Sequence, residues 1–351
     1  MKRIIFFLFL TICTSTARAQ VEVRKNTQHA FPKSIPAGNY SGIAWLGGDQ
    51  YAVVSDKSAD DGFFVFHIVT DSVNGEVKGA YNMGFRSSGH PGRDDEGVAY
   101  NAHTNTVWVS GEADNRIMEY GMDGRRTGRQ LALPDVFAHL PGNLGLEALS
   151  YNALTHRYWT CNESGNIVLQ SFGDDLQPLQ SFAYRLDAPL ANHAKALHYA
   201  HGVGTICALD DGALLVLERE AYVPKMKVGA FVVCKLYRVE PQGADAVAHT
   251  PLPKRLLTSW RTKLTVFDRS FANYEGMCLG PTLTDGSRVL LIVADSQDQY
   301  AGVLKDWITS VKLITPPDPS APPVQERRGL VGATGASPFF MGRNRSYSSK
   351  A

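Results

Sequence analysis

The sequence predicts an all-β fold, a β-propeller of five to six four-stranded blades, with six favoured over five. The chain has 351 residues and is rich in the turn formers glycine and proline, with 32 and 18 of them. Short runs of β-branched and aromatic residues, bounded by Gly, Asp and Asn, recur along it. Variants of one sequence unit also return roughly every 50–70 residues. A single four-stranded sheet cannot cover both of its faces, so such repeats are expected to pack face to face in a ring.

The first residues have the pattern of a signal peptide. The basic pair Lys2-Arg3 precedes an apolar run over residues 4–12, and Ala17-Arg18-Ala19 offers a cleavage site. We therefore expect residues 1–19 to be removed near Ala19 and the protein to be secreted or periplasmic. The apolar run is too short to cross a hydrocarbon layer of ~30 Å. No later segment is long and apolar enough, so we expect no membrane span.

The repeat unit is a pair of strands with an acid at the end of the second. Four copies open with the segments Ser41-Gly-Ile-Ala-Trp45, Glu96-Gly-Val-Ala-Tyr100, Glu147-Ala-Leu-Ser-Tyr151 and Glu275-Gly-Met-Cys-Leu279. Their second strands end in the acids Asp56, Glu112, Glu163 and Asp295. A fifth copy begins near Ile206, lacks the leading glutamate and ends at Glu218. These copies predict five blades.

Two further segments are candidates for the strands of a sixth blade. They are residues 21–32 and the irregular stretch 250–268. The one modest helix candidate is the segment 192–201. We assign residues 20–314 to the propeller domain and expect the Pro/Gly/Ser-rich residues 315–351 to form a flexible tail.

Composition excludes several classes of protein. The 35 basic and 34 acidic residues give a net charge of +1, whereas a nucleic-acid-binding protein normally has a strongly basic face. The sequence contains no nucleophile elbow, zinc-protease motif or phosphate-binding loop.

We expect a monomer that acts on a small molecule. The four cysteines after the signal peptide allow three disulfide pairings, and the simpler interpretation is buried thiols on strands with at most one or two bridges; the cysteines are Cys161, Cys207, Cys234 and Cys278.

The acids of the repeat are expected to gather at one mouth of the propeller channel. Each leading glutamate lies where the innermost strand begins, and the acid of the second, antiparallel strand returns to the same end. Eight carboxylates would meet there: Asp56, Glu96, Glu112, Glu147, Glu163, Glu218, Glu275 and Asp295. Their mutual repulsion has to be relieved. A divalent cation, Ca²⁺ first, would do so with Glu96, Glu112, Glu147, Glu163, Glu275 and Asp295 as ligands. Alternatively, the carboxylates fasten the blades through backbone N–H groups or the bases Lys57, Arg93, Arg116 and Arg219.

The same segments resemble the phytase-like family, whose domain is described as "esterase-like activity of phytase". The resemblance runs from about Tyr40 to about Tyr300, and its most specific pieces are Leu209–Arg219 and Asn273–Gly276. It implies an exported β-propeller with phosphoester or carboxylic-ester hydrolysis. The sequence departs from the pattern at Ser41 and in the copy near Ile206, where no leading glutamate is present, so any metal site would be asymmetric.

Three functions follow as hypotheses. The first is a metal-assisted hydrolase of phosphate or carboxylic esters, with Glu96, Glu147 and Glu275 as catalytic residues. In this hypothesis Lys57, Arg93 and Arg219 bind the substrate, because basic side chains hold phosphate oxygens. A close variant is a lactonase of the gluconolactonase type. The third is a propeller that binds a ligand or a partner protein without catalysis.

Overall fold

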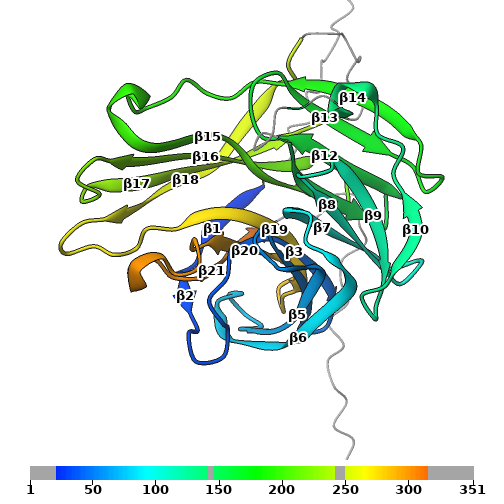
Figure 1. The fold of residues 1–351 in the computed structure, drawn as a ribbon, viewed down its shortest axis with the longest axis horizontal. Helices are drawn as coiled ribbons and strands as arrows, with labels where there is room; N and C mark the ends of the chain where they lie inside the picture. The colour runs from blue at the N-terminus through cyan, green and yellow to red at the C-terminus, as the bar shows by residue number, and fades with distance from the viewer. Residues whose placement is uncertain (1–20, 139, 141–144, 242–249, 315–351) are drawn as a thin grey trace, which may run out of the picture. The chain divides into compact units, whose positions relative to one another are not determined.

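The computed structural model describes residues 21–138, 140, 145–241 and 250–314. Five antiparallel sheets contain nearly all of the regular secondary structure in this part of the chain, and they follow one another in chain order (Figure 1). We call them blades 1 to 5. The prediction of an all-β propeller is confirmed.

Blades 1 to 4 each contain four consecutive strands. Blade 1 is formed by β3 (Tyr40–Gly47), β4 (Gln50–Ser55), β5 (Asp60–Thr70) and β6 (Val77–Pro91). Blade 2 is formed by β7 (Asp95–Asn101), β8 (Thr106–Gly111), β9 (Arg116–Gly121) and β10 (Arg126–Gln130). Blade 3 is formed by β11 (Leu146–Asn152), β12 (Arg157–Asn162), β13 (Ile167–Phe172) and β14 (Pro178–Tyr184). Blade 4 is formed by β15 (Ala196–Ala208), β16 (Leu214–Pro224), β17 (Ala230–Val239) and β18 (Lys254–Leu264).

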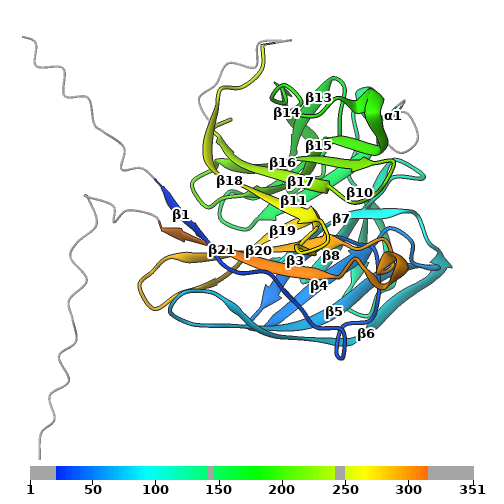
Figure 2. The same cartoon turned by 90° about the vertical axis from the view of Figure 1, so that its left-hand side faces the viewer.

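Blade 5 combines the two ends of the described chain. It contains β19 (Asn273–Thr282), β20 (Arg288–Asp295) and β21 (Trp307–Ile314), and its outer strand is β1 (Glu22–Lys25). The strand β1 runs antiparallel to β21, with Lys25 opposite Val311 (Figure 2). The short strand β2 (His29–Ala30) also pairs with β21. Helical structure is limited to α1 (Asp135–Ala138), η1 (His193–Lys195) and η2 (Tyr300–Gly302) in the described residues.

The inner strands close a ring. Each of β3, β7, β11, β15 and β19 contacts the next in this order, and β19 contacts β3. Five apolar clusters form the core, one at each junction between neighbouring blades. Successive side chains of a strand point to opposite faces of the sheet, so one strand serves two junctions. On β4, Val53 packs towards blade 5 and Val54 towards blade 2.

The described chain forms five blades, and the preference for six was wrong. The two segments that were candidates for a sixth blade complete existing sheets instead. Residues 22–25 and 29–30 pair with β21, and residues 254–264 form the outer strand of blade 4. Without these segments, blades 4 and 5 would each have three strands, and the backbone N–H and C=O groups along the edges of β17 and β21 would be unpaired.

Two smaller expectations have different outcomes. The helix expected over 192–201 is wrong, because only His193–Lys195 form a short 3₁₀ turn and the chain from Ala196 pairs with β16. The four cysteines are buried free thiols, as in the simpler interpretation.

The predictions for residues 1–19 and 315–351 concern segments outside the described residues. In the described part, no helix has the length and apolar character needed to cross a bilayer.

A β-bulge recurs at the same place in all five blades. The pairing of the inner strand with its neighbour shifts by one residue near the start of β3, β7, β11 and β19, and in the second half of the longer β15. The extra residue left unpaired is Ser41, Glu96, Glu147, Gly204 or Glu275. A bulge redirects a side chain away from the regular alternation of the strand. The repeated glutamates are therefore aimed by backbone geometry that all five blades share.

The glycine after the bulge lets neighbouring inner strands approach each other. A Cβ atom on Gly97 would lie 2.6 Å from the backbone N of Leu149, and one on Gly42 would lie 2.6 Å from the carbonyl O of Glu96. Only glycine fits such contacts without displacing the next strand. The Glu-Gly pair thus has a packing role as well as a chemical one.

Gly97→Ala should lower the free energy of unfolding by ~1–3 kcal/mol, because the added methyl group has to push β11 away. Urea denaturation measures the change. The reciprocal control is Ala148→Gly in blade 3, which removes a methyl group at the corresponding position and should cost only ~0.5–1 kcal/mol. Equal stability of Gly97→Ala and the wild type would contradict the close-approach argument.

Candidate functional site

The register of blade 4 identifies the residue that differs most from the repeat. In blades 1, 3 and 5, Ser55, Asn162 and Ala294 face the residue before the bulge, and the acid follows them. In blade 4 that facing position is Glu218, opposite Val203. The residue that corresponds to the acids is therefore Arg219. Blade 4 has a cation where the other four blades have a carboxylate.

Arg219 binds glutamates from the blades on either side of its own. Its Nη2 atom lies 3.0 Å from Oε1 of Glu147, 3.1 Å from Oε1 of Glu163 and 3.0 Å from Oε1 of Glu275. Its Nη1 donates to Oδ1 of Asn273 at 3.1 Å, and Asn273 in turn donates to Glu275 at 2.7 Å. The guanidinium is buried, so these contacts are little screened by solvent. One arginine thereby links blades 3, 4 and 5.

The bulge residue of blade 4 leaves room for this arginine. That residue is Gly204, and a Cβ atom there would lie 3.0 Å from Cδ and 3.2 Å from Nε of Arg219. The substitutions at the two positions therefore belong together. Glycine in place of the glutamate removes one carboxylate and opens the space through which Arg219 reaches the others.

Glu96 lies on the side of the cluster that Arg219 does not reach. Its side chain is buried, and no hydrogen bond or ion pair to its carboxylate is found within the described residues. Burial raises its pKa well above the usual 4.5, and the negative charges of Glu147, Glu275, Asp56 and Glu112 raise it further. The surroundings of Glu96 therefore favour its protonated form.

The acids that contact Arg219 also have raised pKa values. Burial and the neighbouring charge of Glu163 raise the pKa of Glu147 to about 8, although Arg219 opposes this. Burial raises the pKa of Glu275 well above its usual value, again against the effect of Arg219. Burial raises the pKa of Asp295 to about 6, although its hydrogen bonds with Gln297 act in the opposite direction. The site thus holds one carboxyl group with a pKa below 7, Asp295, and one with a pKa above 7, Glu147.

Two further acids lie at the edge of the cluster. Burial raises the pKa of Asp56, which forms an ion pair with Lys57 at 3.1 Å. Glu112 accepts a hydrogen bond from the backbone N–H of Gly145 at 2.8 Å, and its burial also raises its pKa. Both act electrostatically on Glu96. The structure therefore brings Glu96, Glu112, Glu147, Glu163, Glu275, Asp295 and Asp56 into one electrostatic cluster.

Glu218 was wrongly placed in this cluster by the sequence pattern. It accepts a hydrogen bond from the hydroxyl of Tyr184 at 2.7 Å and forms an ion pair with Lys254. These partners belong to β14 and β18, outside the ring of inner strands. Successive residues of a strand point to opposite sides, so Glu218 points away when Arg219 points towards the glutamates.

The three predicted substrate-binding bases have different surroundings. Arg219 lies within the cluster. Lys57 is mostly exposed and bridges Asp56 and Asp94, whose carboxylate oxygen is 2.9 Å from Nζ. Arg93 is not directed into the cluster. Its guanidinium is buried and donates to Asp114 through two bonds of 2.9 Å, and to the hydroxyl of Tyr120 at 2.9 Å. This correction follows from Arg93 filling the hydrogen-bonding needs of blade 2.

The fit of the cluster to a divalent cation differs between its two sides. Glu147, Glu163 and Glu275 already share the cation Arg219. Within the described ranges, no group of three or more His, Cys, Asp or Glu side chains is arranged closely enough to hold a metal. The carboxylates around Glu96 are the donor type that Ca²⁺ takes, and Glu96 has no basic partner in the described chain, but these side chains too are not closely grouped in the structure.

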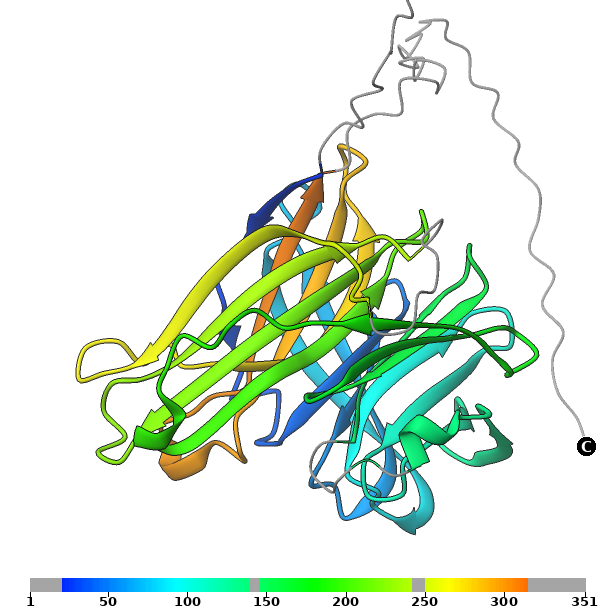
Figure 3. The ribbon, with the colours of Figure 1, turned by 90° about the horizontal axis from the view of Figure 1, so that it is seen from above.

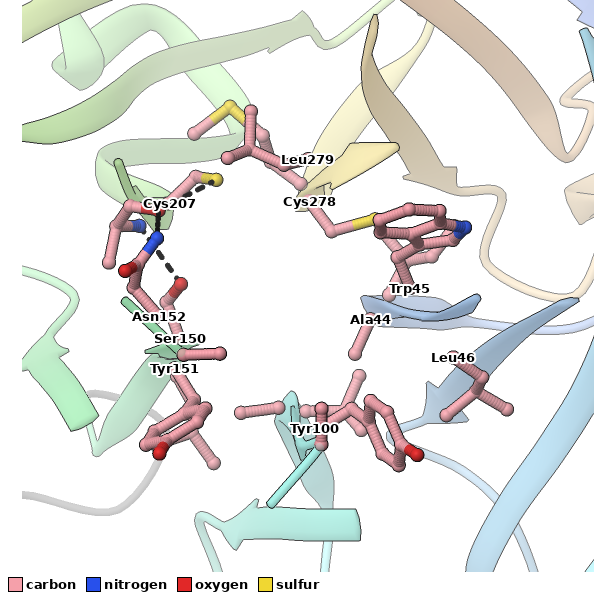
Figure 4. A pocket seen from close by; sticks show the side chains of 18 of the residues that line it. Ala44, Trp45, Leu46, Tyr100, Ser150, Tyr151, Asn152, Cys207, Cys278 and Leu279 are labelled. Carbon is pink, nitrogen blue, oxygen red and sulfur yellow. Dashed lines mark hydrogen bonds between the residues drawn. The ribbon is translucent and has the colours of Figure 1, made fainter. Parts of the chain in front are cut away.

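The other end of the inner strands has a different character. A cavity of about 250 Å³ is lined there by residues from all five blades (Figure 4). Its wall is largely apolar and aromatic, with Trp45, Tyr100, Tyr151 and Leu279 at matching positions of four blades. The carboxylate cluster lies at the starts of the same strands. Because the ionisable side chains gather at the acidic end and the cavity wall is largely apolar, the acidic end is the candidate for chemistry.

Comparison with known proteins identifies the family. The family model described as "Phytase-like: Esterase-like activity of phytase" matches residues 35–297. The chain belongs to the phytase-like family. A search of curated proteins finds no match to this phytase-like chain.

Several solved structures are similar to this phytase-like protein at low sequence identity. Streptogramin B lyase has 13% identity and a TM-score of 0.36, with 84% of this chain and 98% of that chain covered. The WD40 β-propeller domain of Doa1 has 8% identity and a TM-score of 0.36, with 79% and 93% covered. Hydrazine synthase of Kuenenia stuttgartiensis has 8% identity and a TM-score of 0.37, with 75% and 78% covered.

Arg219→Met should lower the free energy of unfolding by ~3–5 kcal/mol, because it leaves buried glutamates without their cation. Urea denaturation near neutral pH measures the loss. The matched control is Arg24→Met, which breaks an exposed ion pair with Glu22 and should cost less than ~1 kcal/mol. A small loss for both variants would show that Arg219 does not hold the blades together.

The stability of the protein should fall as the pH rises from 4.5 towards about 8, in the window set by Glu147. In this window the unfolded chain ionises Glu147 while the folded protein keeps the proton, so rising pH favours unfolding. The contribution is fully present below the ordinary pKa and is lost as the pH passes the folded value. Glu147→Gln should flatten the profile obtained by denaturation at several pH values. An unchanged slope in this variant would contradict the raised pKa.

Proposed function

We propose that this protein is an exported hydrolase of phosphate or carboxylic esters whose active site is the carboxylate cluster around Arg219. The observation that carries the proposal is the buried Glu96 carboxyl group, which lacks a partner in the described residues and has a raised pKa. A structural carboxylate is normally paired, whereas catalytic acids have pKa values shifted by burial and like charges. The family description points to ester hydrolysis as well.

The different pKa values of the acids suit hydrolysis by paired acid and base groups. Glu96, whose pKa is raised by burial and by neighbouring carboxylates, can carry a proton and donate it to the leaving oxygen of an ester. Asp295, whose pKa is about 6, is largely ionised at the same pH and can accept a proton from the attacking water. The water oxygen then bonds to the acyl carbon or phosphorus as the bond to the leaving oxygen breaks. Neighbouring carboxyls whose pKa values differ have such complementary roles in several hydrolases.

The remaining residues would position the substrate. Glu147 and Glu275 are held by Arg219 and fix the shape of the site, as well as its charge. Arg219 supplies the positive charge nearest to these acids and favours an anionic substrate oxygen. Lys57 is exposed at the edge and can attract a phosphate group.

A divalent cation, Ca²⁺ first, is part of the proposal. Glu96 would hold it in its ionised form together with Asp56, Glu112 and Asp295, the acids that Arg219 does not bind in the structure. The cation would then take the place of the Glu96 proton, and the acid–base route describes the site without the cation. When bound, it would supply positive charge that neutralises an anionic substrate and polarises a water molecule.

A propeller that binds a ligand without catalysis is the second candidate. It is favoured by the arrangement of Glu147, Glu163 and Glu275 around a single arginine, since fastening three blades explains these glutamates without chemistry. Glu96 is the residue that separates the two functions, because it fastens nothing in the described chain.

Glu96→Gln should reduce ester hydrolysis by about 10²–10⁴-fold, because the amide cannot donate the proton. The assay uses p-nitrophenyl phosphate and p-nitrophenyl acetate with purified protein. The control is Glu22→Gln on the exposed β1, which should hydrolyse both substrates at the wild-type rate. Loss of activity without loss of thermal stability supports catalysis. Absence of hydrolysis by the wild type on a broad ester panel would favour the binding function.

The same protein samples test the cation. Millimolar Ca²⁺ should raise the melting temperature of the wild type, since a ligand that binds only the folded state stabilises it. Glu96→Gln should weaken this shift. If neither Ca²⁺ nor Mg²⁺, Mn²⁺ or Zn²⁺ shifts the melting temperature, the cation is removed from the proposal and the acid–base part stands on the assay alone.

A further inference from the structure

Blade 4 ends in two adjacent turns remote from the carboxylate cluster. The first turn, residues 225–229, joins β16 to β17, and the second, residues 265–268, follows β18. The backbone N–H of Gly229 donates to the carbonyl of Leu264 at 2.8 Å, so the turns lie side by side. Figures 1 and 3 show both at the outer end of the long strands of blade 4. We call them the blade-4 tip.

Four large apolar side chains at the blade-4 tip are exposed to solvent. The exposed fraction is 98% for Phe267, 83% for Met226, 68% for Val266 and 57% for Val228. Single exposed apolar residues are ordinary on a protein surface, whereas a group of them on neighbouring turns marks an interaction site. Phe267 is almost fully exposed and therefore does not contribute to packing within the propeller.

Hydrogen bonds hold these side chains in their outward position. The backbone N–H groups of Phe267 and Asp268 donate to Oγ1 of Thr265 at 3.3 and 2.8 Å, and the N–H of Thr265 donates to the carbonyl of Asp268 at 2.7 Å. In the first turn, the N–H of Lys227 donates to the carbonyl of Pro224 at 2.8 Å. The apolar side chains are therefore presented by closed turns.

Basic side chains surround the apolar group. The exposed cations of the two turns, of the end of β18 and of the residue after the second turn are Lys225, Lys227, Arg261, Lys263 and Arg269. The one acid in these segments is Asp268, whose carboxylate accepts a hydrogen bond from the N–H of Ser270 at 3.0 Å. The ammonium group of Lys227 lies 4.7 Å from the centre of the half-exposed Tyr300 ring. The protein as a whole has nearly balanced charge, so this excess of cations is local.

We propose that the blade-4 tip docks on the surface of an anionic lipid bilayer. Phe267, Met226 and Val266 enter the boundary between headgroups and acyl chains, and the surrounding lysines and arginines bind the lipid phosphates. Exposed apolar residues ringed by Lys and Arg are typical of protein segments that lie in this boundary. The cations favour an anionic bilayer over the apolar surface of another protein, since they would lose their hydration there without gaining a counter-charge.

The test is co-sedimentation of the full-length protein with vesicles of phosphatidylglycerol mixed with phosphatidylcholine. The wild type should bind these vesicles, bind phosphatidylcholine vesicles much less, and lose binding as the salt concentration rises. The double variant Met226→Ser/Phe267→Ser should bind at least about tenfold more weakly. Both substituted side chains are exposed, so circular dichroism and melting temperature should stay unchanged.

Leu154→Ser provides the matched control, because Leu154 is 72% exposed on a turn of blade 3 and lies outside the blade-4 tip. It should bind vesicles like the wild type. In Phe267→Trp, the tryptophan emission should shift to shorter wavelength when anionic vesicles are added. Equal binding by the wild type and the double variant would overturn the proposal, as would wild-type binding to neither kind of vesicle. Dimerisation that the double variant abolishes, without vesicle binding, would assign the tip to a second copy of the chain instead.

Discussion

The contact of Arg219 with three glutamates is the interaction on which the acidic end of the ring depends. The bulges of the inner strands aim carboxylates at a common centre, and like charges in a buried place destabilise the fold. Blade 4 relieves this repulsion because it differs from the repeat at two linked positions, Gly204 and Arg219. Gly204 stands in place of a glutamate and so removes a negative charge, and Arg219 stands in place of an acid and adds a positive charge. The ring can then close around polar groups at this end and around apolar side chains at the other.

This neutralisation is uneven around the ring. The glutamates of blades 3 and 5 contact Arg219, whereas blade 1 contributes Ser41, whose hydroxyl donates to the carbonyl of Asp95 at 2.6 Å. Glu96 of blade 2 lies between these two environments and receives neither a hydrogen bond nor an ion pair from the described chain. The repeat thus gives the five bulges the same backbone pattern, whereas the side chains at the bulges differ. Among the bulge glutamates, Glu96 of blade 2 is the one without a partner in the described chain.

The sequence pattern was sufficient for the fold and for most of the acids, because both are encoded locally. Alternating apolar residues specify strands, and a glutamate at the same offset in three copies comes to the same place in three blades. The position of Arg219 was shifted by one residue because the copy near Ile206 was aligned on its acid, Glu218. Aligning Ile206 with Ile43 and Val98 would have placed Gly204 at the bulge and Arg219 with the acids. The blade count failed because pairing between distant strands, such as β1 with β21, has no local signal.

The pairing of β1 with β21 has a consequence for how the protein folds. Asn26 donates its side-chain N–H to Oγ of Ser310, a residue 284 positions away in the chain. Contacts between such distant residues carry a large loop-closure entropy and slow the search for the native state. Blades 1 to 4 are each continuous in sequence and can form their sheets from local hairpins. Blade 5 must wait for both ends of the described chain, so joining β1 directly after β21 in a circularly permuted chain would make all five blades local and should speed the final closure of the ring.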